Sequence, residues 1–245
     1  MRPAPRARDV NISGRFRTEG PVVLALLLDL DGTLLQTLDA IVASMNAALA
    51  EVHEPPLTSD ELRPLIGMPV ERQLDLLRGM NGPIVGEITD RYYEHFLGFV
   101  EAGLPLYSGV SETLEALADR PIGTMTTRRR EGARRMLEVS GLDRYFRAIV
   151  GGDEVARPKP APDLPRHSAK ALGVRPEDCV VVGDAPVDIL AGRAARTWTV
   201  AATYGYGDPR ALREVKPHAE IARFADLPKA LEDLEAHRGE RPETS

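Results

Sequence analysis

The chain has 245 residues, 43% of them hydrophobic, which is enough for one large domain or for a domain with an insert. Its net charge of −6 argues against a general nucleic-acid binder or a membrane-surface binder. The single cysteine, Cys179, excludes an internal disulfide and fits a reducing cytoplasm.

The first 20 residues are rich in Arg, Pro and Gly and show no apolar periodicity. They lack the apolar core that a signal peptide needs, so we expect residues 1–20 to form a flexible basic tail.

Residues 22–28 form the first predicted strand, and an acidic loop follows it. All seven are apolar, which is typical of a strand buried on both faces of a parallel sheet. Asp29 and Asp31 come directly after this run, and Gly32 frees the turn. Such close carboxylates repel each other, so we expect a divalent cation such as magnesium beside them. The alternative is that they only cap the following helix.

Residues 37–104 carry only helical patterns and predict an all-helical insert directly after the first strand. Gly103, Pro105 and Gly109 near its second boundary are typical of a hinge. The core domain is then expected at residues 21–36 and 105–235, and residues 236–245 should form a second flexible tail.

Five further apolar runs predict strands after the insert, and amphipathic segments separate most of them. Alternating strands and helices indicate an α/β fold with a mostly parallel sheet flanked by helices. These strands are expected at residues 122–126, 148–150, 180–182, 198–203 and near 220–222.

Two motifs in this half of the chain suit a phosphate group. Thr126 and Thr127 follow the second strand, where a hydroxyl and free backbone N–H groups can cradle an anion, although Thr126 could equally cap the next helix. Prolines flank Lys159 and restrict its loop, from which it can reach a phosphate or the carboxylates. A surface lysine is the alternative.

A second acidic motif follows the strand at residues 180–182. Asp184 and Asp188 are four residues apart, so both lie over the first turn of the next helix, where one can bind a cation and the other can orient the site. In a parallel sheet the carboxyl ends of the strands meet at one edge, so all of these motifs should converge there.

With these motifs in this order, the chain resembles phosphatases of the haloacid dehalogenase superfamily that carry a helical cap after the first strand. Within the superfamily it is most similar to the phosphoglycolate-phosphatase-like group. The resemblance covers roughly residues 22–231 and implies a Rossmann-like core with the insert as cap.

The resemblance also implies a role for each motif residue. Asp29 is expected to be the nucleophile that forms an aspartyl phosphate, and Asp31 the general acid and base. The Asp29 carboxylate, the Asp31 backbone oxygen and the Asp184 side chain are expected to bind Mg²⁺. Asp188 is expected to support this metal site without being a direct ligand. The implied phosphate-binding residues are Thr126, Thr127 and Lys159. Superfamily dehalogenases lack an acid at the position of Asp31, so its presence favours phosphoryl transfer.

The insert is expected to select the substrate. Arg63 and Gly67 lie in a segment that resembles the cap loop over the active site, and Arg63 could pair with a substrate carboxylate. Equally, Arg63 could be a solvated residue, and Gly67 could simply allow a tight turn. Thr127 and Gln36 depart from the Asn and Asp that relatives often carry, which leaves the exact substrate open.

The sequence thus predicts a cytoplasmic, Mg²⁺-dependent phosphatase of a small phosphorylated metabolite such as 2-phosphoglycolate, with no nucleic-acid or membrane partner, as a monomer or homodimer. The alternatives on the same scaffold are a phosphomutase of the β-phosphoglucomutase type, a pyrophosphatase, and a non-catalytic phosphate-binding protein.

Overall fold

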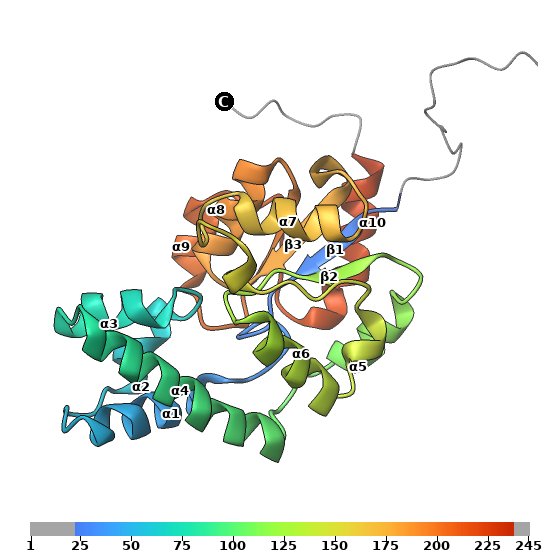
Figure 1. The fold of residues 1–245 in the computed structure, drawn as a ribbon. Helices are drawn as coiled ribbons and strands as arrows, with labels where there is room; N and C mark the ends of the chain where they lie inside the picture. The colour runs from blue at the N-terminus through green and yellow to red at the C-terminus, as the bar shows by residue number, and fades with distance from the viewer. Residues whose placement is uncertain (1–22, 238–245) are drawn as a thin grey trace, which may run out of the picture.

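The computed structural model describes residues 23–237, which form a five-stranded parallel sheet flanked by helices, with a helical insert beside it (Figure 1). The predicted tails at residues 1–20 and 236–245 lie outside the described residues, except for positions 236 and 237. The strand order is β2-β1-β3-β4-β5, and every neighbouring pair is parallel. The strands are β1 (Ala25–Leu28), β2 (Ile122–Thr124), β3 (Cys179–Gly183), β4 (Trp198–Ala202) and β5 (Ala219–Ile221).

Strand β1 lies between β2 and β3, with Leu26 in register with Ile122 on one side and with Val180 on the other. Its four residues are completely buried, because helices cover both faces of the sheet. The uninterrupted apolar run in the sequence is explained by this position.

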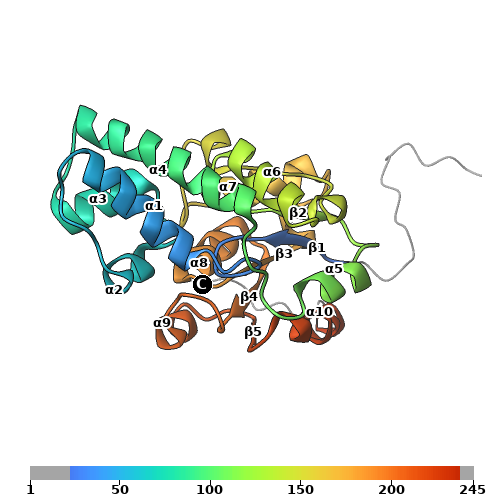
Figure 2. The same ribbon diagram turned by 90° about the horizontal axis from the view of Figure 1, so that it is seen from below.

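Helices α7 and α8 cover one face of the sheet, and α5 and α10 cover the other (Figure 2). Residues of β1 alternate between the two layers, so Leu27 belongs to the same buried cluster as Leu164 of α7, and Leu26 to the cluster that includes Leu231 of α10. The helices of the core are α5 (Val110–Ala116), α6 (Arg130–Val139), α7 (Asp163–Ala171), α8 (Pro186–Ala195), α9 (Pro209–Glu214) and α10 (Leu227–Ala236).

The insert consists of four helices between β1 and β2, grouped at one side of the sheet in Figures 1 and 2. Helices α1 and α4 pack along each other, and their buried stripes include Met45 and Phe96. Helix α4 also reaches α6 of the core, where Arg135 forms two hydrogen bonds with Glu101. The insert helices are α1 (Leu38–Glu51), α2 (Ser59–Leu62), α3 (Val70–Arg78) and α4 (Pro83–Ala102).

The structure confirms the predicted α/β fold with its helical insert, with one correction. Residues 148–150 do not form a strand, and only an isolated bridge joins Ala148 to Gly123. The reason is the Thr124 hydroxyl, which accepts from the Val150 N–H at 2.6 Å and donates to the Val150 carbonyl at 2.8 Å. A side chain thus takes the place of a backbone ladder.

Among the described residues, no helix is both long and apolar enough to cross a membrane.

Candidate active site

Asp29 leaves the carboxyl end of β1 and remains attached to the sheet, because its N–H donates to the Val182 carbonyl of β3 at 3.0 Å. Its carboxylate is buried, with the residue only 4% exposed. The chain then turns at Gly32, whose φ is +77° and whose missing Cβ would lie 2.2 Å from an oxygen of Asp184. A glycine is therefore needed here both for the turn and for the close approach of the second acidic motif.

Asp184 and Asp188 approach Asp29 from the end of β3. One oxygen of each of these three carboxylates lies within 4.8 Å of the others, and all three residues are buried. The Asp184 carboxylate accepts from the Tyr206 N–H at 2.7 Å and from the Thr33 hydroxyl at 3.1 Å. These bonds fix the orientation of Asp184 and leave carboxylate oxygens for a further partner.

Lys159 lies between two of the carboxylates. Its Nζ donates to Asp188 Oδ1 at 2.6 Å and to Asp29 Oδ1 at 3.0 Å, and its side chain is completely buried. Burial on its own would lower the pKa of Lys159, but the charges of Asp188 and Asp29 outweigh it and raise the pKa above its usual range. The ammonium therefore stays charged beside them.

The cluster carries more negative than positive charge, with one lysine for the three carboxylates Asp29, Asp184 and Asp188. Burial raises the pKa of Asp29 well above 3.8, against the effect of Lys159. Burial and the charge of Asp188 raise the pKa of Asp184 to about 7. Buried oxygens with this excess of charge match the donor preference of a hard divalent cation, so these residues fit a metal.

The two threonines follow β2, the strand next to β1, and differ in their surroundings. Thr126 is completely buried, and its hydroxyl accepts from the Arg128 N–H at 3.1 Å. It does not cap α6, because the residue at that position is Arg129. Thr127 is partly buried and lines the cavity beneath the insert.

Asp31 has a different partner from the other carboxylates. Arg128 donates to both of its oxygens at 2.8 Å, through Nε and one terminal nitrogen. Burial on its own would raise the pKa of Asp31, but the charge and hydrogen bonds of Arg128 outweigh it, so the pKa falls below 3.8. The insert completes this site: the Tyr92 hydroxyl accepts from Arg128 at 2.9 Å, and the guanidinium carbon lies 3.7 Å from the centre of the Phe96 ring.

A small cavity of about 30 Å³ lies between the insert and the core. Gly67 lines it, together with Asp31 and Arg128. Arg63 is exposed and is not among the lining residues, so the guanidinium facing this cavity comes from the core.

Four residues at this site are not marked as functional by any sequence motif: Arg128, Tyr92, Gln73 and Tyr206. Three consecutive arginines look alike in a sequence, and a tyrosine on an apolar helix stripe is indistinguishable from a core residue. For Tyr206 there was a signal, the glycines on either side: a Cβ on Gly205 would lie 2.3 Å from the Asp184 Cβ, so this loop packs directly on the acidic motif.

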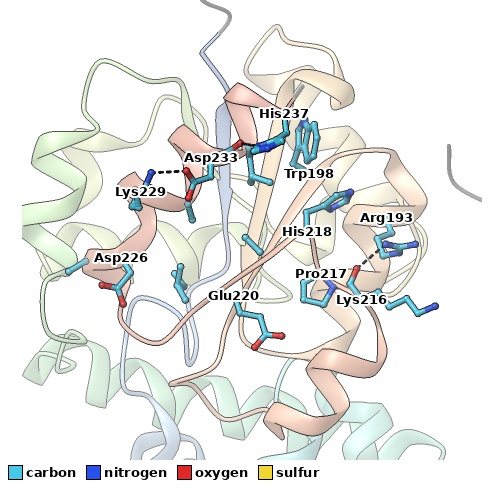
Figure 3. A pocket seen from close by; sticks show the side chains of 15 residues that line it. Arg193, Trp198, Lys216, Pro217, His218, Glu220, Asp226, Lys229, Asp233 and His237 are labelled. Carbon is cyan, nitrogen blue, oxygen red and sulfur yellow. Dashed lines mark hydrogen bonds and ion pairs between the residues drawn. The ribbon is translucent and has the colours of Figure 1, made fainter. Parts of the chain in front are cut away.

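A wider cavity of about 910 Å³ lies elsewhere, between β5 and α10 (Figure 3). None of the motif residues lines it. Its charged side chains pair locally, with Lys229 donating to Asp233 at 2.7 Å and Arg193 to the Lys216 carbonyl at 2.9 Å (Figure 3). The convergent buried charges favour the smaller cavity as the active site.

A parallel sheet with acidic residues at the ends of β1 and β3 and helices inserted after β1 defines a Rossmann-like α/β protein with a helical cap. The chain matches the family model described as Haloacid dehalogenase-like hydrolase over residues 26–202, and it belongs to this family.

Individual relatives carry two different names. The chain is 33% identical to a phosphoglycolate phosphatase of Agrobacterium fabrum, over 87% of this chain and 94% of that protein. It is 29% identical to the pyrophosphatase PpaX of Listeria innocua, over 87% of this chain and 98% of that protein. Among solved structures, a predicted phosphoglycolate phosphatase from Haemophilus somnus has a TM-score of 0.77 and 26% identity, covering 85% of this chain and 97% of that one.

Proposed function

We propose that this protein is a Mg²⁺-dependent phosphatase that hydrolyses a small phosphorylated metabolite through an aspartyl phosphate on Asp29. The observation that carries the proposal is the grouping of Asp29, Lys159, Asp184 and Asp188 in one buried cluster at the ends of β1 and β3. The names of the relatives add support, since both describe phosphate-releasing enzymes.

In the first step, an Asp29 oxygen attacks phosphorus, and the bond between phosphorus and the leaving oxygen breaks. Asp31 donates a proton to that oxygen. In the second step, water attacks phosphorus, Asp31 takes a proton from it, and the bond from Asp29 to phosphorus breaks. The two steps together thus return both aspartates to their starting state.

The remaining residues neutralise and position charge. Lys159 is close enough to Asp29 to hold the nucleophile and to contact a phosphoryl oxygen, while Thr126 and Thr127 supply hydroxyl and backbone donors beside it. Asp29, the backbone oxygen of Asp31 and Asp184 would hold Mg²⁺, with Asp188 supporting them. When bound, the ion would neutralise charge on the phosphoryl group.

The Asp31 carboxylate is ionised in its ion pair with Arg128, so it can donate a proton only after this pair opens and the carboxylate takes up a proton from solvent. We infer that substrate binding beneath the insert separates Asp31 from Arg128. Movement of the insert would admit substrate and exclude water.

Phosphate release decides the proposal. A panel of 2-phosphoglycolate, sugar phosphates, nucleotides and pyrophosphate should be tested with Mg²⁺ and with chelator. We expect metal-dependent release concentrated on one compound, and loss of turnover in Asp29→Asn with the fold intact. Full activity of Asp29→Asn would overturn the proposal.

Pyrophosphate is a second candidate substrate, because several relatives are named pyrophosphatases. Preferential release from pyrophosphate would support it. A mutase would instead form an isomeric sugar phosphate without net release, and a non-catalytic protein would bind ligand without turnover. A cytoplasmic location, a monomeric or dimeric state and the absence of nucleic-acid and membrane partners are part of the proposal.

A further inference from the structure

Arg128 is a buried cation with hydrogen-bonding capacity to spare. It is only 6% exposed, and it lines the cavity between insert and core. A guanidinium has five N–H donors. Two of them bond to Asp31 and one to Tyr92, so two have no acceptor among residues 23–237. These two donors can bind an anion that enters the cavity.

Gln73 of α3 lines the same cavity and offers the opposite chemistry. The residue is 5% exposed, and its Nε2 donates to the Met68 carbonyl at 3.0 Å, which fixes the orientation of the amide. Its Oε1 is buried and has no hydrogen-bond donor among the described residues. A buried carbonyl oxygen without a donor is unfavourable, so a ligand hydroxyl that donates to it would stabilise binding.

The size of the cavity restricts what can occupy this place. At about 30 Å³ it is close to the volume of one water molecule in the liquid, and apolar side chains such as Ile66 and Val70 form part of its wall. A leaving group of a few non-hydrogen atoms needs only a modest movement of the insert. A sugar would need a much larger one.

We propose that Arg128 and Gln73 form a leaving-group subsite that selects small phosphoryl donors whose leaving group carries both an anionic group and a hydroxyl. Two of the Arg128 N–H donors would bind the anion, and Gln73 Oε1 would accept the hydroxyl hydrogen. A phosphorylated dihydroxy acid, which keeps one free hydroxyl, and a protonated pyrophosphate share this chemistry. The inference rests on the proposed phosphoryl transfer to Asp29, and it adds the identity of the leaving group.

The test compares leaving groups in wild type and in three variants. The substrates are 3-phosphoglycerate (anion and hydroxyl), pyrophosphate, 2-phosphoglycolate (anion alone), glycerol 3-phosphate (hydroxyls alone) and methyl phosphate (neither). The variants are Arg128→Gln, Gln73→Leu and the control Arg134→Gln, an exposed arginine on α6. If the wild type prefers 3-phosphoglycerate to pyrophosphate, the subsite selects a phosphorylated dihydroxy acid; the opposite preference indicates protonated pyrophosphate.

Arg128→Gln should raise KM by about tenfold or more for the three anionic leaving groups and by less than about twofold for the other two. Gln73→Leu should raise KM for 3-phosphoglycerate and leave that for methyl phosphate unchanged, and Arg134→Gln should match wild type. An equal loss of kcat/KM on all five substrates in Arg128→Gln would overturn the inference, because Arg128 would then act only by positioning Asp31.

Measuring how the free leaving group binds tests this inference independently of the proposed function. We expect calorimetry to show that glycerate binds wild type, that glycerol does not, and that Arg128→Gln weakens glycerate binding about tenfold. If wild type releases no phosphate but binds glycerate in this way, the proposed function fails and the subsite stands. Equal glycerate affinity in wild type and Arg128→Gln overturns the subsite. Arg128→Lys, which keeps the charge, replaces Arg128→Gln if the latter does not fold.

Discussion

The backbone N–H of Tyr206 donates to Asp184 Oδ2 at 2.7 Å. The phenol oxygen of the same tyrosine accepts from the N–H of Leu38 at 2.9 Å and from the N–H of Thr37. Helix α1 begins at Leu38, and the Thr37 side chain does not cap it. Tyr206 therefore caps the first helix of the insert while it holds a carboxylate of the core site.

Tyr206→Phe should destabilise the protein without damaging the acidic cluster. The variant leaves two N–H groups of the first turn without their acceptor, so we expect the free energy of unfolding to fall by about 1 kcal/mol. Urea unfolding measures this loss. Mg²⁺ affinity should not change, because the main-chain bond to Asp184 remains.

Tyr93→Phe is the control. Tyr93 lies on α4 of the insert, and its hydroxyl makes no hydrogen bond to another described residue. Its free energy of unfolding should equal that of wild type. An equal loss in both variants would show that Tyr206 has no capping role.

Lys159→Met should affect both stability and turnover. The substitution leaves Asp29 and Asp188 buried without their shared cation, and breaking a buried ion pair in this way typically costs about 3–5 kcal/mol. We expect that loss in chelator by urea unfolding, together with loss of phosphate release. Lys229→Met serves as control, because its side chain is 72% exposed and its pairing with Asp233 lies at the surface. A Lys159→Met protein as stable as the control would contradict the ion-pair argument.

The pKa of Asp184 predicts how stability depends on pH and metal. Burial, aided by Asp188, raises this pKa from 3.8 to about 7. Between these values the folded, metal-free protein holds a proton that the unfolded chain has lost. The contribution of Asp184 to stability should therefore fall as pH rises through this window, by at most about 1.4 kcal/mol per pH unit.

A divalent cation would replace that proton, so the stabilisation by Mg²⁺ should be larger at pH 8 than at pH 5. Melting temperatures in chelator and in Mg²⁺ across this pH range measure the difference. Asp184→Asn should have a smaller pH slope than wild type and lose most of the response to Mg²⁺, while Asp29, whose pKa is also raised, keeps part of the slope. Equal stabilisation at pH 5 and pH 8 would show that proton and metal do not compete at Asp184.

How much of the fold could be predicted depends on where each strand lies. Strands β1 and β3 are central and buried on both faces, so their sequences are uninterrupted apolar runs. Residues 148–150 are also apolar, but they lie beyond β2 at the edge, where the Thr124 hydroxyl replaces the ladder. A local pattern carries no information on which edge residue a distant side chain will bond.

The same contrast holds for the site. Asp29 and Asp184 come directly after buried strands, so topology alone brings them together. Arg128 has no such signal, because only the position of helix α4 distinguishes it from Arg129 and Arg130. Tyr92 and Phe96 of that helix enclose the first arginine, while the other two remain exposed.

The start of β1 is tied to α10 by an ion pair that should be energetically coupled. Arg120 donates to Glu235 through two nitrogens, and one of them also donates to the Leu24 carbonyl at 3.2 Å. Glu235 in turn accepts from the Leu24 N–H at 2.8 Å. Both side chains are mostly buried, at 15% and 22% exposure, so the pair is better ordered than a surface salt bridge.

A double-mutant cycle of Arg120→Gln and Glu235→Gln tests this coupling by urea unfolding. Each single variant should be destabilised, because it leaves the other charged side chain without its ion-pair partner. The double variant should lose less than the sum, with a coupling energy of about 0.5–3 kcal/mol. Arg223→Gln and Asp226→Asn form the control cycle, since this pair is more exposed, at 76% and 35%, and should show a smaller coupling energy. Additive losses in the first cycle would mean that apolar packing alone holds α10 against β1.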